Sequence, residues 1–204
     1  MFPADDGLFC IKEAVMKRIY VYIYQDMADF EVTVLLQRLR MTGGREIVAV
    51  SEDMEPVTSQ SGLRYLPDLR IADVTPSDAD EALLIPGGPI RMEQNAIAPL
   101  VRSFLDRGLL VGAICFGPQF LARAGILADR RYTTSCPPEK LADMGLADFF
   151  PREHCVPARV VTDGNLITAQ GYAFVDFAQA VCGYLHIFRD EQHAWEQLGR
   201  IKEG

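Results

Sequence analysis

The first half of the chain alternates short apolar runs with periodically spaced apolar residues. Residues 16–24 carry the β-branched and aromatic side chains typical of a buried strand. A helix face follows, with apolar residues at the i, i+3, i+4, i+7 spacing: Val32, Leu35, Leu36 and Leu39. Gly43-Gly44 ends this helix, and residues 46–52 read as a second strand. The pattern predicts a βαβ unit with a right-handed crossover in a parallel sheet.

The alternation continues with variation. Short extended pieces are expected between residues 56 and 74. Further elements are predicted in this order: a strand at 80–88, a helix at 94–107, a strand at 109–115, a helix opening at Gly117-Pro118, a hairpin turning at Asp163-Gly164-Asn165, and an apolar helix at 172–188. Strands alternating with helices indicate an α/β protein rather than an all-α or all-β one.

Length and composition refine this picture. We expect residues 1–15 to be an N-terminal extension and residues 16–204 to form a single domain. The chain is 49% hydrophobic and 24% charged, which is ordinary for a globular protein. A net charge of -8 and no basic cluster argue against nucleic-acid binding. No apolar run is long enough to cross a membrane, and the start lacks a secretory signal, so we expect a cytoplasmic location.

The cysteines and histidines limit the available chemistry. The five cysteines are widely spaced and form no C-x-x-C pair, so we expect reduced thiols rather than disulfides or a zinc site. No nucleotide-binding glycine fingerprint is present, and we predict neither a metal nor a nucleotide cofactor. The three histidines fall late in the chain; none is assigned as a catalytic base, and His186 is expected on a helix face near the core.

Three candidate groups follow predicted strands: Glu31, Gly87-Gly88 and Cys115. In an open α/β sheet, loops beyond the carboxyl ends of the strands meet at one edge. A cysteine on a strand-to-helix turn faces amide groups that stabilise a thiolate, so we expect Cys115 to have a lowered thiol pKa. Gly88 is a candidate oxyanion donor, and Glu31 a proton carrier. The alternative is that Cys115 is a small apolar filler of the core.

A set of motifs then appears in order: "DFE" after the first strand, "ALLIPGG", "AICFGPQFLARAGIL", "YTTSCPPEKLADMG" and "VVTDGNLITAQG". In residues 16–188 the chain resembles the ThiJ/PfpI superfamily, which includes a parkinsonism-associated deglycase, bacterial stress-induced glyoxalases and intracellular protease/amidase proteins. The resemblance implies a flavodoxin-like three-layer sandwich with a mainly parallel central sheet, of the class I glutamine amidotransferase-like type. It also implies a nucleophile elbow at Cys115, Glu31 as its acidic partner, oxyanion amides at Gly88 and Phe116, and a homodimer.

The chain also departs from that family's pattern. Phe116 stands directly after the cysteine, where protease-like members have histidine, which argues against a peptidase. At a second position that often carries histidine, the stretch "TTSCPPEK" offers Cys136, which would line the pocket, act as a resolving thiol, or be incidental. Tyr172 in "GYAF" is a candidate for shaping the site.

Three functions fit these features. The preferred hypothesis is a cysteine-dependent hydrolase or amidase, or a related small-molecule enzyme, in which Cys115 attacks the carbonyl of a small substrate. A glyoxalase or deglycase acting on α-oxoaldehydes is the weaker version, because without the histidines Glu31 alone would move the protons. The second is a redox-responsive stress protein in which Cys115 is oxidised. The third is a binding module without chemistry. The scaffold alone does not decide among them.

Overall fold

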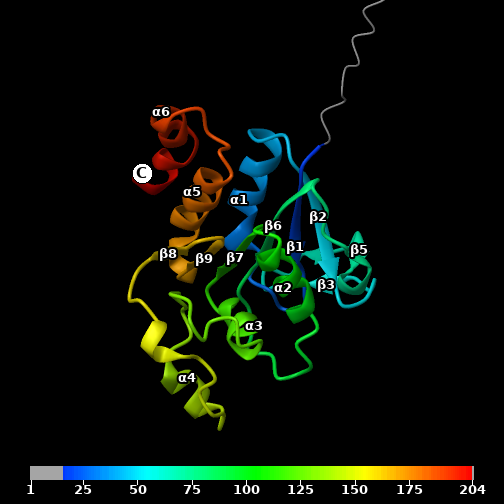
Figure 1. The fold of residues 1–204 in the computed structure, drawn as a ribbon, viewed down its shortest axis with the longest axis vertical. Coiled ribbons are helices and arrows are strands. Elements are labelled where there is room, and N and C mark those ends of the chain that lie inside the picture. The colour runs from blue at the N-terminus through cyan, green and yellow to red at the C-terminus, as the bar shows by residue number, and fades with distance from the viewer. Residues whose placement is uncertain (1–15, 204) are drawn as a thin grey trace, which may run out of the picture.

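A sheet of seven strands runs through the centre of the protein, in the order β5-β2-β1-β6-β7-β9-β8 (Figure 1). The computed structural model describes residues 16–203, and the predicted extension at 1–15 lies outside them. The strands of this sheet are β1 (Arg18–Tyr22), β2 (Glu46–Ser51), β5 (Leu69–Arg70), β6 (Asp80–Ile85), β7 (Leu110–Ile114), β8 (Val160–Asp163) and β9 (Leu166–Ala169). All neighbours pair in parallel except β8, which closes one edge antiparallel to β9.

Helices cover both faces of the sheet. The α-helices are α1 (Phe30–Met41), α2 (Ala98–Asp106), α3 (Pro118–Arg123), α4 (Pro138–Asp143), α5 (Phe174–Tyr184), α6 (Glu191–Ala194) and α7 (Arg200–Glu203). Short 3-10 helices lie at Ile71–Asp73, Arg152–His154 and Gly171–Ala173, and a π-helical stretch at Trp195–Gly199. A separate hairpin pairs β3 (Val57–Thr58) with β4 (Arg64–Tyr65). Figure 1 shows α1 and α5 side by side on one face, and α2 and α3 on the other.

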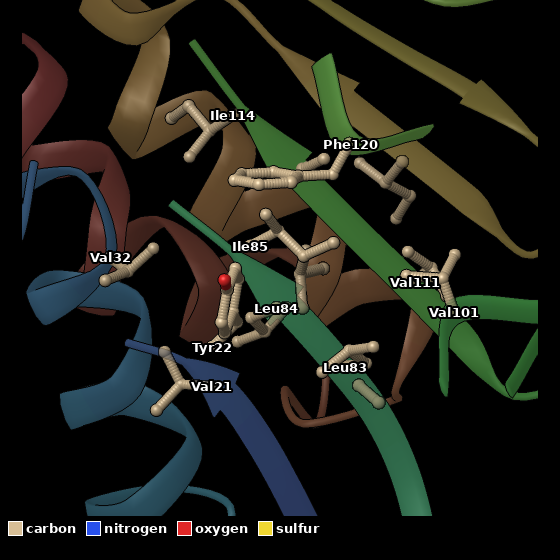
Figure 2. Close-up of a cluster of buried hydrophobic side chains, with 14 of the residues drawn as sticks. Val21, Tyr22, Val32, Leu83, Leu84, Ile85, Val101, Val111, Ile114 and Phe120 are labelled. Atoms are coloured by element: carbon tan, nitrogen blue, oxygen red, sulfur yellow. The ribbon is translucent and has the colours of Figure 1, made fainter. Parts of the chain in front are cut away.

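The alternation of side chains along β1 explains why both faces are covered. The ring of Tyr20 packs edge-on against Phe104 of α2, while Tyr22 packs against Phe120 of α3. Val21 points the opposite way, towards Val32 of α1 (Figure 2). Because successive side chains of a strand alternate between faces, apolar residues at every position require a layer on each side. The three-layer α/β sandwich predicted from the sequence is therefore confirmed.

The strand order reverses at one point of the sheet, between β1 and β6. From β1 the chain first moves outward to β2 and β5, and then returns to place β6 on the other side of β1. Such a reversal is where loops diverge and ligands bind in open parallel sheets. The loops that follow β1, β6 and β7 all begin at this edge.

Two helices are shorter than the pattern predicted. The helix expected at 94–107 begins at Ala98, with Pro99 in its first turn, where the missing N–H of proline costs little. The helix expected at 172–188 spans only Phe174–Tyr184, because Gly171–Ala173 form a 3-10 turn before it. His186 lies beyond the end of α5, exposed and with φ 52°, so the expectation of a helix-face position near the core was wrong.

Candidate active site

Cys115 lies at a strained corner between β7 and α3. Its φ of 61° places it in the left-handed region, which a residue with a Cβ adopts at a cost. The surrounding backbone holds it there: the Cys115 amide donates to the Ala169 carbonyl at 2.8 Å, and its own carbonyl accepts from the Thr134 hydroxyl at 2.7 Å. This is the nucleophile elbow that the resemblance implied, because the geometry presents the thiol outward from the end of the strand.

Glu31 is the second residue of α1, the helix that follows β1. In the sheet, β6 lies between β1 and β7, the strand that precedes Cys115. Its side chain is 3% exposed, and Oε2 accepts a hydrogen bond from the Gly87 amide at 2.8 Å. Burial raises the pKa of the Glu31 carboxyl above its usual value, although hydrogen bonds from Cys115 and Gly87 act in the opposite direction. The carboxyl is thus poised to gain or lose a proton beside the sulfur.

Two glycines make the contact between carboxyl and thiol possible. A Cβ on Gly87 would lie 2.5 Å from Glu31 Oε2 and 3.0 Å from Cys115 Sγ. On Gly171 it would lie 2.8 Å from Glu31 Oε1 and 2.9 Å from the same sulfur. No side chain larger than hydrogen fits at either position without moving the pair. The sequence had marked Gly87 only as one of a glycine pair, and Gly171 not at all.

The expected lowering of the Cys115 pKa is wrong. Burial, followed by the charge and hydrogen bond of Glu31, raises the pKa of the Cys115 thiol to about 12. Ser135 and the Phe116 amide favour the thiolate but do not outweigh these causes. The helix behind the cysteine has only six residues, so the dipole on which the expectation rested is small. The charge and hydrogen bond of Glu31 thus oppose the loss of the Cys115 proton, so the two groups titrate as a coupled pair.

Of the two predicted oxyanion donors, the Phe116 amide hydrogen-bonds the sulfur of Cys115. The Cβ position of Gly88 lies beside Tyr24 and Asp26, and its role as a donor stays a prediction. Gly88 follows Gly87 directly, and within residues 16–203 its amide has no hydrogen-bond acceptor. A free amide on a loop beside a nucleophile is the type of donor that binds a developing oxyanion.

Ser135, rather than Cys136, meets the reactive cysteine. The Ser135 amide donates to the Cys115 carbonyl at 2.9 Å, and its hydroxyl interacts with the sulfur. That hydroxyl donates to Gln170 Oε1 at 3.0 Å and accepts from the Gly171 amide at 2.8 Å. Sequence reasoning missed Ser135 because it took the neighbouring cysteine as the more chemically active residue.

Cys136 is fully buried next to Ser135, with Arg152, Asp148 and Lys140 as its charged neighbours. Its place in the pocket and its role as a resolving thiol stay predictions. Tyr172 is 66% exposed, and its ring lies under the Arg159 guanidinium at 5.0 Å, so it belongs to the rim of the site rather than its interior.

The described residues contain neither a metal-binding cluster nor a membrane-spanning helix. Within residues 16–203, no group of three or more His, Cys, Asp and Glu side chains is arranged to hold a metal ion. In the same range, no helix is both long and apolar enough to span a membrane. Nor does a histidine act on the Cys115 thiol, whose perturbing groups among the described residues are Glu31, Ser135 and Phe116.

Fold and site together define a class: α/β proteins with a cysteine at a strained strand-to-helix corner, beside a buried carboxyl, at the carboxyl edge of a mainly parallel sheet. The chain belongs to the DJ-1/PfpI family, whose sequence pattern it matches over residues 17–183. A solved structure of a DJ-1 superfamily protein from Agrobacterium tumefaciens is similar, with a TM-score of 0.77 and 32% identity, covering 93% of this chain and 100% of that one.

The relatives carry several enzyme names. A deglycase of Thermococcus kodakarensis is 30% identical over 146 residues, covering 70% of this chain and 82% of the relative. A glutathione-independent glyoxalase of Caenorhabditis elegans is 35% identical over 109 residues, covering 52% and 58%. An isonitrile hydratase and an uncharacterized protease are also among the relatives. The family thus contains enzymes of several reaction types.

Proposed function

We propose that the protein is a cysteine-dependent enzyme that adds the Cys115 sulfur to the carbonyl carbon of a small electrophile, with 2-oxoaldehydes as its substrate class. The observation that carries this proposal is the approach of the buried Glu31 carboxyl to the Cys115 thiol, which meet beside Gly87. Glyoxalase and deglycase names among the relatives support it.

The first step uses the pair as nucleophile and base. Glu31 takes the thiol proton while sulfur forms a bond to the aldehyde carbon, and the carbonyl electron pair moves onto oxygen. The amides of Gly88 and Phe116 donate to this oxyanion, which then takes the proton back from Glu31. A raised carboxyl pKa suits the role, because a base works best when its pKa approaches the working pH.

The later steps favour a 2-oxoaldehyde over an amide. After addition, the proton on the aldehyde carbon moves to the adjacent carbonyl carbon, and the hydroxyl proton of the adduct moves to the oxygen of that carbonyl, giving a thioester of a 2-hydroxy acid. Water then adds to the thioester, the Cys115 sulfur leaves and takes up a proton, and the 2-hydroxy acid is released. The hydrolase or amidase alternative uses the same Cys115 and amides and also needs water, but it adds the protonation of a leaving amine, without a histidine to share the work. It stays a prediction, as do the homodimer and the cytoplasmic location.

Methylglyoxal provides the direct test. We expect lactate to form as methylglyoxal is consumed, turnover to vanish in Cys115→Ala, and kcat to fall by a factor of about 10² or more in Glu31→Gln. Cys155→Ala is the matched control, because Cys155 is also partly exposed but lies outside the site. Lactate formation that persists in Cys115→Ala would refute the proposal.

A further inference from the structure

Gln119 is a fully buried polar side chain on α3 that takes no part in the steps above. Its Oε1 accepts the Arg91 amide at 2.7 Å, and its Nε2 donates to the Pro89 carbonyl at 2.9 Å. An amide N–H can only donate and a carbonyl can only accept, so both ends of the Gln119 amide have a fixed orientation. The side chain therefore closes the loop at 89–91 onto α3.

The contact between Gln119 and the loop links the two segments that carry the proposed oxyanion donors, Gly88 and Phe116. Gly88 directly precedes Pro89 on the loop, and Phe116 lies three positions before Gln119 at the start of the helix. The beginning of the loop is held from another side, where the Tyr24 hydroxyl donates to the Pro86 carbonyl at 3.0 Å. Beyond Gly88, the loop is tied to α3 by Gln119 and by the more exposed guanidinium of Arg123, which donates to the carbonyls of residues 91 and 93.

We propose that Gln119 is a positioning residue, which fixes the spacing of the Gly88 and Phe116 amides around the oxyanion of a substrate bound to Cys115. The proposal rests on the function proposed above for the same site. Gln119 acts through the two amides, because its own polar atoms are committed to Pro89 and Arg91. It follows that Gln119 affects reactions that develop an oxyanion, and leaves the reactivity of the thiol itself unchanged.

The test compares two reactions of Cys115 in Gln119→Met, which keeps the length of the side chain and removes both hydrogen bonds. Propionaldehyde, which has no second carbonyl and so cannot go on to a thioester, forms a thiohemiacetal: sulfur bonds to the aldehyde carbon, and the carbonyl oxygen takes up the thiol proton. The dissociation constant of this adduct is measured by NMR with ¹³C-labelled propionaldehyde. Iodoacetamide alkylates the same sulfur by displacing iodide and develops no oxyanion. We expect the thiohemiacetal to weaken by roughly tenfold to hundredfold, with the alkylation rate within about twofold of wild type.

Asn95→Leu is the matched control. The Asn95 amide also hydrogen-bonds α3, at the Phe120 carbonyl at 2.7 Å, but it does so at the far end of the loop, away from Gly88. It should leave both reactions unchanged. If Gln119→Met does not fold, Gln119→Glu at pH 8 replaces it, since a carboxylate keeps the acceptor for Arg91 and loses the donor to Pro89.

The outcomes separate this proposal from the function on which it rests. If the thiohemiacetal weakens in the variant but wild type forms no lactate, the positioning role holds and the proposed turnover fails. If lactate forms and the thiohemiacetal is equally stable in both proteins, the positioning role is overturned alone. Absence of the thiohemiacetal from both proteins, or an equal loss of both reactions in Gln119→Met, also overturns it.

Discussion

The Glu31 carboxylate and the Cys115 sulfur approach the same point from two sides: the position where a side chain on Gly87 would begin, 2.5 Å from Oε2 and 3.0 Å from Sγ. No side chain lies between the two groups there. A buried acid in contact with a largely buried thiol cannot lose both protons cheaply, because the second ionisation places two negative charges in a poorly solvated site. The Glu31 charge therefore helps to raise the Cys115 pKa, whereas burial raises the Glu31 pKa against the opposing effect of the Cys115 hydrogen bond.

Adding a methyl group at Gly171 should disable the site. Its Cβ would lie 2.9 Å from the Cys115 sulfur, so Gly171→Ala must displace either the thiol or Glu31. We expect methylglyoxal turnover to fall by about 10²-fold, and the free energy of unfolding to drop by about 1–3 kcal/mol through overpacking. Gly183→Ala is the control: nothing lies within 4 Å of its Cβ position in α5, so activity should be unchanged and stability equal or up to about 1 kcal/mol higher. Equal activities in wild type and Gly171→Ala would contradict the packing described.

Glu31→Gln should stabilise the protein at neutral pH. The folded-state pKa of Glu31 is raised, so the folded protein binds this proton more tightly than the unfolded chain does. That contribution to stability is complete below the unfolded value of 4.5 and is lost as the pH rises through the higher folded value. At pH 7 the ionised Glu31 is therefore a cost, and the neutral amide removes it. Thermal melts from pH 4 to pH 8 should show a higher Tm for Glu31→Gln than for wild type at neutral pH. This difference in Tm should shrink towards acid pH. A lower Tm for Glu31→Gln than for wild type at pH 7 would contradict the presence of a costly buried charge.

Backbone strain at the elbow predicts a difference between two inactive variants. Cys115→Ala keeps a Cβ at φ 61°, whereas Cys115→Gly does not. Left-handed backbone costs about 1–2 kcal/mol for a residue with a Cβ, and the greater freedom of glycine in the unfolded chain offsets part of the gain. We expect Cys115→Gly to be more stable than Cys115→Ala by up to about 1 kcal/mol in urea denaturation. A large deficit for the glycine variant would mean that the corner is not strained.

Much of the fold could be predicted from the chain, because the apolar spacing is regular wherever an element packs against the sheet. The α1 helix shows this well: Val32, Leu35 and Leu39 are its buried apolar positions. Boundaries were less accurate where contacts distant in sequence set them. Residues 89–95, part of which was expected to be helical, are instead held by side chains of α3, such as Gln119 and Arg123.

The residues of the site also divide into those that their sequence position predicts and those that it does not. Cys115, Glu31 and Gly88 were found because each follows a strand, and strand ends meet at one edge of a parallel sheet. Gly171 also follows a strand, β9, which is parallel to β7, but it was treated only as the end of a hairpin. Ser135 could not be found by that argument, because it lies in an irregular segment and reaches the sulfur through close packing that local sequence does not encode. The direction of the Cys115 pKa shift was also predicted wrongly, because the depth of burial is a property of the assembled fold.

The most direct test of the central claim is the rate of Cys115 alkylation by iodoacetamide as a function of pH, followed peptide by peptide in wild type and Glu31→Gln. The fully buried Cys136 and Cys182 serve as internal controls for folding. If carboxyl and thiol titrate as a coupled pair, the wild-type rate rises through the raised pKa of Glu31, stays level across the neutral range, and rises again only towards the Cys115 pKa of about 12. In Glu31→Gln the acid step disappears and a single rise remains, at a lower pH than the wild-type upper step, because the negative charge is gone. Superimposable single rises near the ordinary thiol value of about 8.5 in both proteins would contradict the account.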